Sequence, residues 1–496
     1  MLLYLVSAGC LSYLVYYYWW RRRHLPAGPF PIPGLGALFP FLNTRPREAL
    51  RKLEWAYGPL YTLTSGNKDM IMINDWQLIQ ETIVNDPDTF VDRDDNWLLD
   101  YLRDGPYGVI MTSGDKWREQ RRFTLHVLRD LGFGRTIMED NILDEIRHSA
   151  EQIDRAVVDG SVDLEPVLQL CVGNVINHTV FGQRFDDNGE TVRSIKDNLD
   201  AFLEKFGEDW RMMFLAFEFS KHLPWLKDIF DQMDEAKALT IERFKKTTEE
   251  LRRQLDLNSE PASLAEAYLQ HMAKIERGEC EPGHFSSQQL AALVFDIWTA
   301  GFDTTVTTLQ WMFLYMLHYP EVQQKVQQEI DAVVGGDSDV RMEHKRELPY
   351  TTATITELQR CIDLVPFNIP RKTNKDVTIQ GYHFEKGTII VPQISAVMQN
   401  PEYFPKPERF DPNRFLEADG VTLKRIPMMV PFSTGRRSCL GESMAKMELF
   451  LIFGNLLRSY SFSKVPFTAF PPLQTKSFMA SMPKPFKCQV TKRVVG

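Results

Sequence analysis

The sequence predicts a mainly α-helical protein with a small β-rich lobe, in which one large domain follows a short N-terminal anchor. Helical periodicity of apolar residues dominates residues 136–255, and one long apolar helix is expected over Gln288–His318. Strand-like runs are short and lie at Leu60–Leu63, Met70–Ile73, Val377–Phe384, Thr388–Pro392 and within Tyr460–Val495. No linker divides the chain after residue 40, so residues 41–496 are expected to form a single domain.

Composition narrows the functional classes. The formal net charge of −9 gives no reason to expect nucleic acid as a partner. The ten histidines form no HExxH arrangement. The six cysteines show no CxxC pair, which argues against a disulfide framework or a zinc site and fits a reducing compartment. These cysteines are Cys10, Cys171, Cys280, Cys361, Cys439 and Cys488.

The first 20 residues carry no charge. As a helix they would span roughly 30 Å, the thickness of a bilayer core. Tyr16–Trp20 would form an aromatic belt, and Arg21–Arg23 would mark the cytoplasmic side. A cleaved signal peptide, the alternative, has its positive charges before the apolar run. We therefore expect residues 1–20 to be a retained, single-pass transmembrane anchor and the main domain to be cytosolic.

Residues 21–40 are expected to form a basic, proline-rich hinge, because the prolines of Leu25–Gly36 favour a semi-rigid extended spacer. Helices are predicted at residues 44–57 and at Asp75–Val84. The aromatic-rich residues 197–225 are either helix core or a pliable roof over an apolar cavity. The polar stretch Leu255–Ser287 is predicted to be a surface connection with one short helix.

Cys439 is the strongest candidate for chemistry. It lies between Gly435 and Gly441 and just ahead of a predicted helix over Glu442–Leu457, where the helix dipole and free N–H groups favour a thiolate. The two glycines allow a flat ligand to approach the backbone closely. Arg437 offers a fork that suits a carboxylate. Taken alone, a single cysteine is more often a buried structural thiol.

Two helices carry further candidates. On the helix over Asp115–Asp130, Trp117 and Arg121 share one face and would clamp a carboxylate, although an isolated pair of this kind also occurs by chance on an exposed helix. On the long apolar helix, Gly301 costs about 1 kcal/mol relative to alanine. Its presence therefore needs a packing or functional reason, such as a gap over a flat cofactor. Thr304 can bond back to the Ala300 carbonyl and loosen the helix there, beside the Asp303 carboxylate.

The pattern FxxGxRxCxG, filled by Phe432, Gly435, Arg437, Cys439 and Gly441, resembles the haem-binding signature of the cytochrome P-450 superfamily. Three further runs match the family in order along the chain. They are FGxRF at Phe181–Phe185, the oxygen-binding motif [AG]Gx[DE]T[TS] at Ala300–Thr305, and ExxR at Glu357–Arg360. The resemblance covers nearly the whole chain and is closest to the animal microsomal members that oxidise drugs, steroids and fatty acids.

The resemblance implies the cytochrome P-450 fold and haem b with its iron held by Cys439. It also implies cofactor contacts by Trp117, Arg121, Arg371 and Arg437, and proton delivery by Thr304 and Asp303. Glu357 and Arg360 would form a buried structural triad with Arg414, for which Arg409 is the competing third member. The candidates to line an apolar substrate cavity are Ile110, Ala300, Val365, Phe367, Ile369 and Phe478.

By resemblance the protein is an endoplasmic-reticulum monooxygenase for a small apolar substrate. NADPH would supply electrons through cytochrome P-450 reductase, and cytochrome b5 is a second candidate partner. A haem-thiolate isomerase or dehydratase, which would not need Asp303 and Thr304, and a non-catalytic haem sensor are the alternatives. Arg118, Arg122 and Arg129 are spaced along one helix, and Arg436 lies beside the cysteine loop. These four are predicted to form a basic docking face for the acidic reductase.

Overall fold

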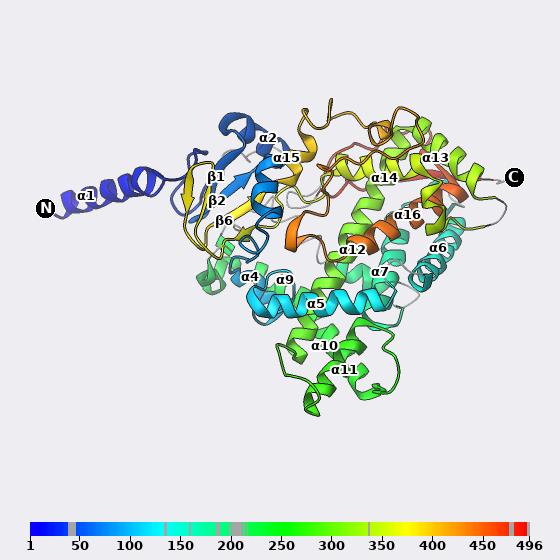
Figure 1. Cartoon of the computed structure of the whole chain (residues 1–496), viewed down its shortest axis with the longest axis horizontal. Helices are drawn as coiled ribbons and strands as arrows, with labels where there is room; N and C mark the ends of the chain where they lie inside the picture. The colour runs from blue at the N-terminus through cyan, green and yellow to red at the C-terminus, as the bar shows by residue number, and fades with distance from the viewer. Residues whose placement is uncertain are drawn as a thin grey trace.

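The computed structural model of this 496-residue chain confirms a mainly helical fold with small β-sheets. It describes residues 1–37, 46–132, 136–157, 160–184, 189–197, 200, 211, 214–215, 217–335, 338–475 and 481–493. Figure 1 shows a helical body that carries the sheet on the N-terminal side, with α1 projecting away from it. The predicted cavity residue Phe478 lies outside the described residues, as does most of the aromatic-rich stretch 197–225.

Helices make up most of the described chain. The α-helices are α1 (Leu2–Val15), α2 (Pro46–Tyr57), α3 (Trp76–Ile79), α4 (Trp97–Arg103), α5 (Gly114–Asp130), α6 (Thr136–Ala156), α7 (Glu165–Phe181), α9 (Lys227–Lys237), α10 (Arg243–Gln254), α11 (Leu264–Glu276), α12 (Ser287–His318), α13 (Pro320–Val333), α14 (Pro349–Ile362), α15 (Ile394–Gln399) and α16 (Glu442–Ser459). Short 3-10 or π turns are η1 (Tyr16–Trp20), η3 (Gln80–Val84), η6 (Glu218–His222), η7 (Pro224–Leu226), η8 (Ala238–Glu242), η9 (Met342–Arg346), η10 (Pro412–Phe415) and η11 (Gly435–Arg437).

Three small sheets complete the fold. The largest has the order β1-β2-β6-β3, with β1 antiparallel and β6 parallel to β2. The strands are β1 (Leu60–Ser65), β2 (Lys68–Ile73), β3 (Arg371–Lys372), β4 (Val377–Ile379), β5 (Tyr382–Phe384), β6 (Ile389–Pro392), β7 (Tyr460–Lys464) and β8 (Cys488–Lys492). Each predicted strand run therefore contains a strand, but in the C-terminal run only β7 and β8, of five residues each, are extended strands among the described residues.

The centre of the helical body is α12, which passes through the molecule in Figure 1. The Ser286 hydroxyl caps its start by accepting a hydrogen bond from the backbone N–H of Gln289 at 3.1 Å. Most of its apolar side chains are buried against α7, α14 and α16, and Trp298 and Phe302 have no exposed surface. The helix therefore lacks a distinct polar face, as expected for a helix that is buried on nearly every side.

The proline-rich segment is docked on the sheet and does not act as a free spacer. The backbone N–H of Thr62 donates to the Ala27 carbonyl at 3.0 Å, and its hydroxyl donates to the Pro26 carbonyl at 2.8 Å. A side chain at Gly28 would meet the Thr62 carbonyl oxygen at 1.9 Å, so this close approach requires glycine. Arg21 forms an ion pair with Asp69 at 2.6 Å.

In the N-terminal segment, α1 is followed directly by the π-helical turn η1. Among the described residues, no helix is both long enough and apolar enough to cross a membrane.

One expectation from the sequence was incomplete. The polar stretch Leu255–Ser287 contains α11, a 13-residue helix, and α11 is not merely a surface connection. Its face bearing Ala265, Tyr268 and Leu269 is buried in the main core. The polar residues of this stretch lie on the other face and in the flanking turns, which is why composition alone concealed the buried stripe.

Candidate active site

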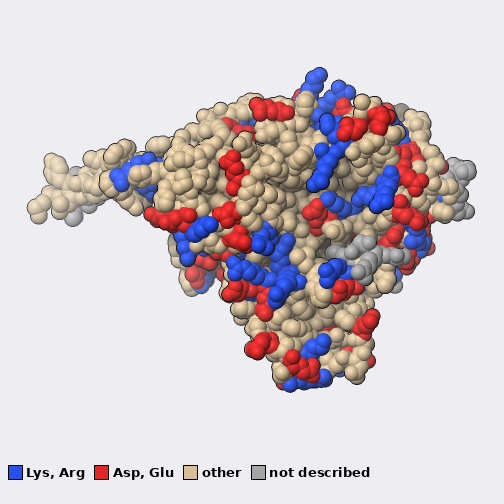
Figure 2. Space-filling view, in the orientation of Figure 1, with Lys and Arg blue, Asp and Glu red and all other residues tan. Residues whose placement is uncertain are grey.

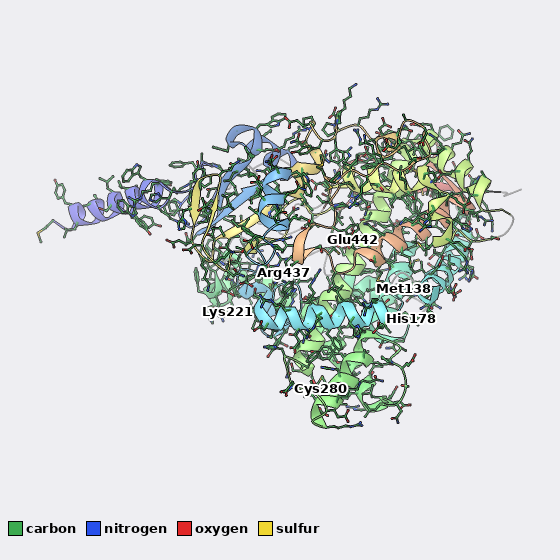
Figure 3. All side chains as sticks on the ribbon, viewed as in Figure 1. Met138, His178, Lys221, Cys280, Arg437 and Glu442 are labelled. Atoms are coloured by element: carbon green, nitrogen blue, oxygen red, sulfur yellow. The ribbon has the colours of Figure 1, made fainter. Side chains whose placement is uncertain are left out.

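Cys439 lies in the loop between η11 and α16, and its backbone N–H donates to the Phe432 carbonyl at 2.9 Å. Arg437 and Glu442, which flank it in sequence, both lie above α5 in the view of Figure 3. The Cys439 side chain is exposed, yet surrounding protein has removed much of its solvation. Cys439 is therefore accessible although protein surrounds it, unlike Cys171 and Cys488, which are buried in the core.

Burial raises the pKa of the Cys439 thiol, and this effect outweighs the backbone N–H of Gly441 and the Arg121 guanidinium, which both lower it. The donors expected at the start of the helix are present, but they do not outweigh the effect of burial on the thiol pKa. A cation at the sulfur is needed to hold the thiolate, and a coordinated metal ion deprotonates a thiol outright. This chemistry fits a metal-bound cofactor.

The two glycines beside Cys439 act differently. Gly435 has a φ of +72°, and a Cβ there would lie 2.5 Å from the Ile83 carbonyl oxygen and 3.3 Å from Arg371. Its lack of a side chain therefore serves a close contact within the protein. A Cβ at Gly441 would meet no atom of the described residues within 4 Å, so no close contact requires glycine at that position.

A group of arginines, here called the arginine cluster, surrounds the cysteine loop and consists of Arg93, Arg121, Arg371 and Arg437. Loss of solvation, followed by mutual repulsion, lowers the pKa of Arg93 to about 9, of Arg371 to about 10 and of Arg437 to about 8. For Arg121 the lowering comes from burial and is opposed by the Cys439 sulfur. Positive charges that have lost solvation and repel one another favour a bound anion between them.

Two buried N–H donors at this site, one of them in the arginine cluster, have no hydrogen-bond partner among the described residues. Arg371 is 2 % exposed and donates through Nη2 to the Thr434 carbonyl at 2.7 Å. Its Nη1 finds no hydrogen-bond partner among the described residues, and neither does the buried Nε1–H of Trp117. Buried donors of this kind cost free energy unless a ligand accepts from them. A flat cofactor with an axial metal for Cys439 and two carboxylates for these donors fits this set of residues.

Arg437 was predicted to bind a carboxylate, but most of its guanidinium N–H groups already donate to backbone carbonyls. It donates from Nε to the Val91 carbonyl at 2.6 Å and from Nη2 to the Thr112 carbonyl at 2.5 Å. Arg93, which sequence reasoning missed, donates in the same way to the Ile110 and Pro370 carbonyls at 3.1 and 2.6 Å. In the sequence Arg93 stands among Asp92, Asp94 and Asp95, so nothing distinguished it from a surface charge.

The oxygen-motif residues lie on α12. The Thr304 hydroxyl donates to the Ala300 carbonyl at 2.6 Å, the back-bond expected from the sequence. Ala300 is exposed, so α12 presents a surface there and not a packed contact. Asp303 points to another partner, since its Oδ1 lies 2.9 Å from Nζ of the buried Lys196.

Gly301 has a packing reason. A Cβ at this position would lie 3.0 Å from Cδ1 of Ile176 on α7, which is tighter than ordinary contact. The glycine therefore allows α7 and α12 to approach closely, and it does not leave the expected gap over a cofactor. The cost of glycine in a helix is offset here by packing between the two helices.

The predicted cavity residues fall into two groups. Ile110 and Ile369 are brought together by Arg93, which donates to both of their carbonyls at 3.1 Å. Ile110 is also tied to α12, because its N–H donates to Asp296 at 2.9 Å. Val365 and Ile369 are 43 % and 44 % exposed. Phe367 instead packs against the sheet-side core that contains Tyr61 and Val391.

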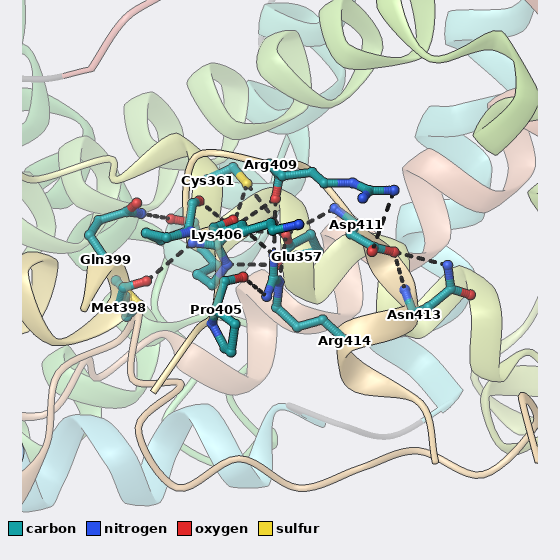
Figure 4. Close-up of polar contacts among 12 residues, drawn as sticks. Glu357, Cys361, Met398, Gln399, Pro405, Lys406, Arg409, Asp411, Asn413 and Arg414 are labelled. Atoms are coloured by element: carbon teal, nitrogen blue, oxygen red, sulfur yellow. Dashed lines mark hydrogen bonds and ion pairs between the residues drawn. The ribbon is translucent and has the colours of Figure 1, made fainter. Parts of the chain in front are cut away.

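The ExxR pair is fully buried. Arg360 donates to both oxygens of Glu357 at 2.6 and 2.8 Å, and both side chains have no exposed surface. Arg414 donates from Nε to Glu357 Oε1 at 3.1 Å, as Figure 4 shows. Arg409 accepts from Arg360 and Arg414 through its backbone carbonyl, while its side chain is 67 % exposed and reaches Asp411 at 4.0 Å, not Glu357. Geometry therefore favours Arg414 as the third member.

Two buried acids near the motif residues were not anticipated. Asp296 on α12 pairs with Arg103 at 2.6 Å and accepts from the backbone of Val109 at 2.8 Å, so it ties the loop after α4 to α12. Glu448 on α16 accepts from the Thr305 hydroxyl at 3.4 Å, and burial raises its pKa to about 8. In sequence, both resemble ordinary polar positions of a helix.

The predicted basic face lies along a groove of about 1080 Å³ beside α5. Arg118, Arg122, Arg129 and Arg436 line it, together with Arg121 and Ser438 near the cysteine loop. Figure 2 shows basic side chains gathered over α5 with acidic ones among them. Arg118 pairs with Asp115 at 2.8 Å and Arg436 with Asp88 at 2.6 Å, so part of the positive charge is locally balanced.

Comparison with known proteins agrees with this site. The sequence model of the family described as Cytochrome P450 matches residues 26–490. Cytochrome P450 2C23 of Rattus norvegicus is 33 % identical over 465 residues, 92 % of this chain and 91 % of that protein. Cytochrome P450 2D10 of Mus musculus is 36 % identical over 441 residues (88 % and 86 %), and cytochrome P450 2H2 of Gallus gallus is 31 % identical over 498 residues (99 % and 98 %). The chain therefore belongs to the cytochrome P450 family and is an NADPH-dependent oxidoreductase, a monooxygenase that carries haem b through a cysteine thiolate.

Proposed function

We propose that this monooxygenase inserts one atom of dioxygen into a small apolar organic substrate, such as a fatty acid, a steroid or a xenobiotic. The second oxygen atom leaves as water, with two electrons and two protons consumed per turnover. The observation that carries the proposal is the exposed Cys439 beside the arginine cluster, where two buried N–H donors have no partner among the described residues. This combination suits a cofactor that contains a metal ion and carries two carboxylates. The helix α12 would then supply Asp303 and Thr304 for the reaction.

Cys439 would hold the haem iron. Trp117, Arg121 and Arg371 would donate to the two propionates, and Arg437 would hold Trp117 and the neighbouring backbone in place. When bound, the haem supplies oxygen activation, which the electron density of an axial thiolate favours. The unpaired Nε1–H of Trp117 and Nη1 of Arg371 support these assignments.

Thr304 and Asp303 would deliver protons to the reaction from α12. The Thr304 hydroxyl is bonded to the Ala300 carbonyl, and one short rotation frees it to donate to a water molecule or to accept from it. Asp303 adds a carboxylate one residue away. A threonine and an acid would not be needed at this place by a haem protein that only senses a ligand.

The substrate cavity would be lined by Ile110, Ala300, Val365 and Ile369, with Phe367 and Phe478 as further candidates. These side chains are apolar, and an apolar pocket discriminates weakly, by roughly 10–200-fold per methylene group. The lining therefore supports a broad apolar substrate class and does not favour one compound.

Electrons would reach the enzyme from NADPH through the flavoprotein cytochrome P-450 reductase, with cytochrome b5 as a second candidate donor. The groove along α5 supports docking on this side because it opens beside Ser438 and the cysteine loop. A basic face there would steer an acidic partner by long-range attraction. Arg118, Arg122, Arg129 and Arg436 are the residues proposed to contact the reductase.

Residues 1–20 are proposed to anchor the protein in the endoplasmic-reticulum membrane, with residues 21–40 as the connection and residues 41–496 as the cytosolic catalytic domain. The uncharged run that ends in three arginines supports this orientation. The ion pair between Arg21 and Asp69 would hold the sheet close to the anchor.

The test is reconstitution of the purified holoenzyme with reductase and NADPH, followed by product analysis with mixed fatty acids, steroids and drug-like probes. Oxygenated products and a red-shifted Soret band of the reduced carbon-monoxide complex are expected. Cys439→His should retain haem but lose oxygenation, because imidazole lacks the electron donation of a thiolate. A histidine-type band in an active parent enzyme contradicts the ligand assignment, and NADPH-independent conversion of a probe contradicts the reaction class.

A further inference from the structure

Lys196 is a buried lysine in the helical residues 190–197. It is 2 % exposed and lies on the same helix face as Val192 and Ile195, which are buried in the main core. Lysines are almost never buried this deeply unless they are paired, because the ammonium group loses its solvation. The position therefore points to a specific partner.

The partners are two carboxylates. Nζ of Lys196 lies 2.9 Å from Oδ1 of Asp303 on α12, and it also pairs with Asp200 one turn further along its own segment. The contact with Asp303 is an ion pair without well-directed hydrogen-bond geometry. The two acids together raise the pKa of Lys196 even though burial opposes them, so the lysine is charged. The single ammonium group of Lys196 thus pairs with both the Asp200 and the Asp303 carboxylates.

This arrangement separates the two residues of the oxygen motif. The Thr304 hydroxyl is bonded to its own helix, at the Ala300 carbonyl, while the Asp303 carboxylate is drawn toward the segment that packs on α12. The side chains of Asp303 and Asp200 are each 13 % exposed, so the pair is nearly but not completely sealed. The position of the acid is therefore set from outside α12.

We propose that Lys196 is a positioning residue for oxygenation, which holds the carboxylate of Asp303 at the side of α12 that faces residues 190–197. The inference rests on the proposed role of Asp303 in proton delivery. It adds that the acid depends on a residue about one hundred positions earlier, outside every motif of the sequence. A displaced segment would release the carboxylate and disturb the supply of protons.

The physical consequence of removing Lys196 is specific. Lys196→Met keeps much of the side-chain volume but leaves two like charges together in a site of low polarity, so one must move toward solvent or bind a proton. Lys196→Arg keeps the charge. In Asp303→Asn one positive charge, on Lys196, and one negative charge, on Asp200, remain paired. Removing the acid should therefore destabilise the protein less than removing the lysine.

The first experiment measures product formed per NADPH consumed by the holoenzyme with reductase. Lys196→Met should lower this ratio roughly tenfold and divert reducing equivalents to hydrogen peroxide. The expected loss is smaller than the roughly 10²–10⁴-fold that a positioned acid or base contributes, because Asp303 itself remains. Lys196→Arg should restore most of the ratio. The control is Arg193→Met, which removes a positive charge from an exposed position of the same segment and should change little. An unchanged ratio in Lys196→Met overturns the proposal, as does an Lys196→Arg enzyme as uncoupled as Lys196→Met.

The second experiment does not depend on turnover. The thermal midpoint of Lys196→Met should fall by several degrees, and adding Asp303→Asn should recover part of the loss because one unpaired carboxylate is removed. Additive losses without recovery contradict the pairing. A parent enzyme that oxygenates no probe overturns the proposed function and the catalytic part of this inference, and the recovery then reports on the ion pair alone.

Discussion

The guanidinium carbon of Arg437 lies 3.8 Å from the centre of the Trp117 ring, and Arg121 approaches the same ring at 6.0 Å. A desolvated contact of the closer kind contributes about 2 kcal/mol. The ring is thus held by its charged neighbours while its Nε1–H has no partner among the described residues. One side chain therefore supports the arginine cluster and also presents a donor to the cofactor site.

Trp117→Phe removes this donor and keeps an aromatic ring for Arg437 to contact. We expect the variant to fold and to lose haem about tenfold faster, because a hydrogen bond to a charged acceptor contributes about 1.5–3 kcal/mol. The measurement is the rate of haem transfer to an excess of a haem-free globin. Trp97→Phe is the matched control, since the buried Trp97 Nε1–H, on α4, also has no partner in the part of the chain that the structure describes. Equal rates for all three proteins would show that the Trp117 donor does not face the cofactor.

Arg414→Ala should destabilise the fold strongly, because it removes a partner of the fully buried Glu357 and leaves negative charge less well compensated. Breaking a buried pair costs about 3–5 kcal/mol. Arg409→Ala is the control, with an expected effect within about 0.5 kcal/mol, because that side chain is 67 % exposed. Urea unfolding midpoints of the two variants test the assignment, and a larger loss in Arg409→Ala would reverse it.

Much of the fold was predictable because local signals agreed with the tertiary structure. The predicted helix over Gln288–His318 is α12 (Ser287–His318), and the predicted helix over Glu442–Leu457 is α16 (Glu442–Ser459). Their long apolar runs leave few alternatives to burial. The start of each is also marked in the sequence, by the Ser286 cap and by the Gly441 turn.

What the sequence did not reveal concerns partners that are distant along the chain. Arg93 donates to carbonyls more than 270 residues away, at Ile369 and Pro370, and Lys196 pairs with Asp303 on another element. Local patterns carry no information about such contacts. Gly301 illustrates the same limit. A glycine in the middle of a helix indicated a close approach, but the sequence could not tell whether Ile176 or a cofactor makes that approach.

Thr304→Ala should bind haem and substrate normally but form less product per NADPH, by roughly tenfold, with a matching rise in hydrogen peroxide. The reason is the loss of a hydroxyl able to exchange its bond between the Ala300 carbonyl and water. Thr308→Ala is the control, since the Thr308 hydroxyl makes the same kind of bond one turn later, to the Thr304 carbonyl at 2.7 Å. If both variants uncouple equally, the effect belongs to the helix backbone and not to Thr304.

Glu448 should make the protein less stable as the pH rises. Burial raises its pKa from 4.5 to about 8, with Thr305 opposing, so the native state holds a proton that the unfolded state releases between these values. The free energy of unfolding therefore falls with increasing pH across this window, by at most about 1.4 kcal/mol per pH unit, and levels off above it. Glu448→Gln should flatten this part of the curve in urea titrations at pH 5 to 8. An unchanged slope would mean that Glu448 is ionised in the native protein.

The last prediction concerns electron delivery. Arg122 lines the groove beside the cysteine loop, whereas Arg118 and Arg436 in the same groove are each paired with an aspartate. Arg122→Glu should therefore slow reduction by the flavoprotein at low salt and leave substrate binding unchanged, because it reverses charge on the proposed docking face.

Arg253→Glu supplies the control for that prediction, since it makes the same charge change at an exposed position of α10. Stopped-flow reduction rates over a salt series are the measurement. The difference between Arg122→Glu and the parent should vanish toward 1 M salt, where the Debye length falls to about 3 Å, because only a long-range attraction is screened in this way. A defect that persists at high salt would instead indicate a lost short-range contact. Equal slowing by Arg253→Glu would show that the reductase senses the total charge of the enzyme and not the groove along α5.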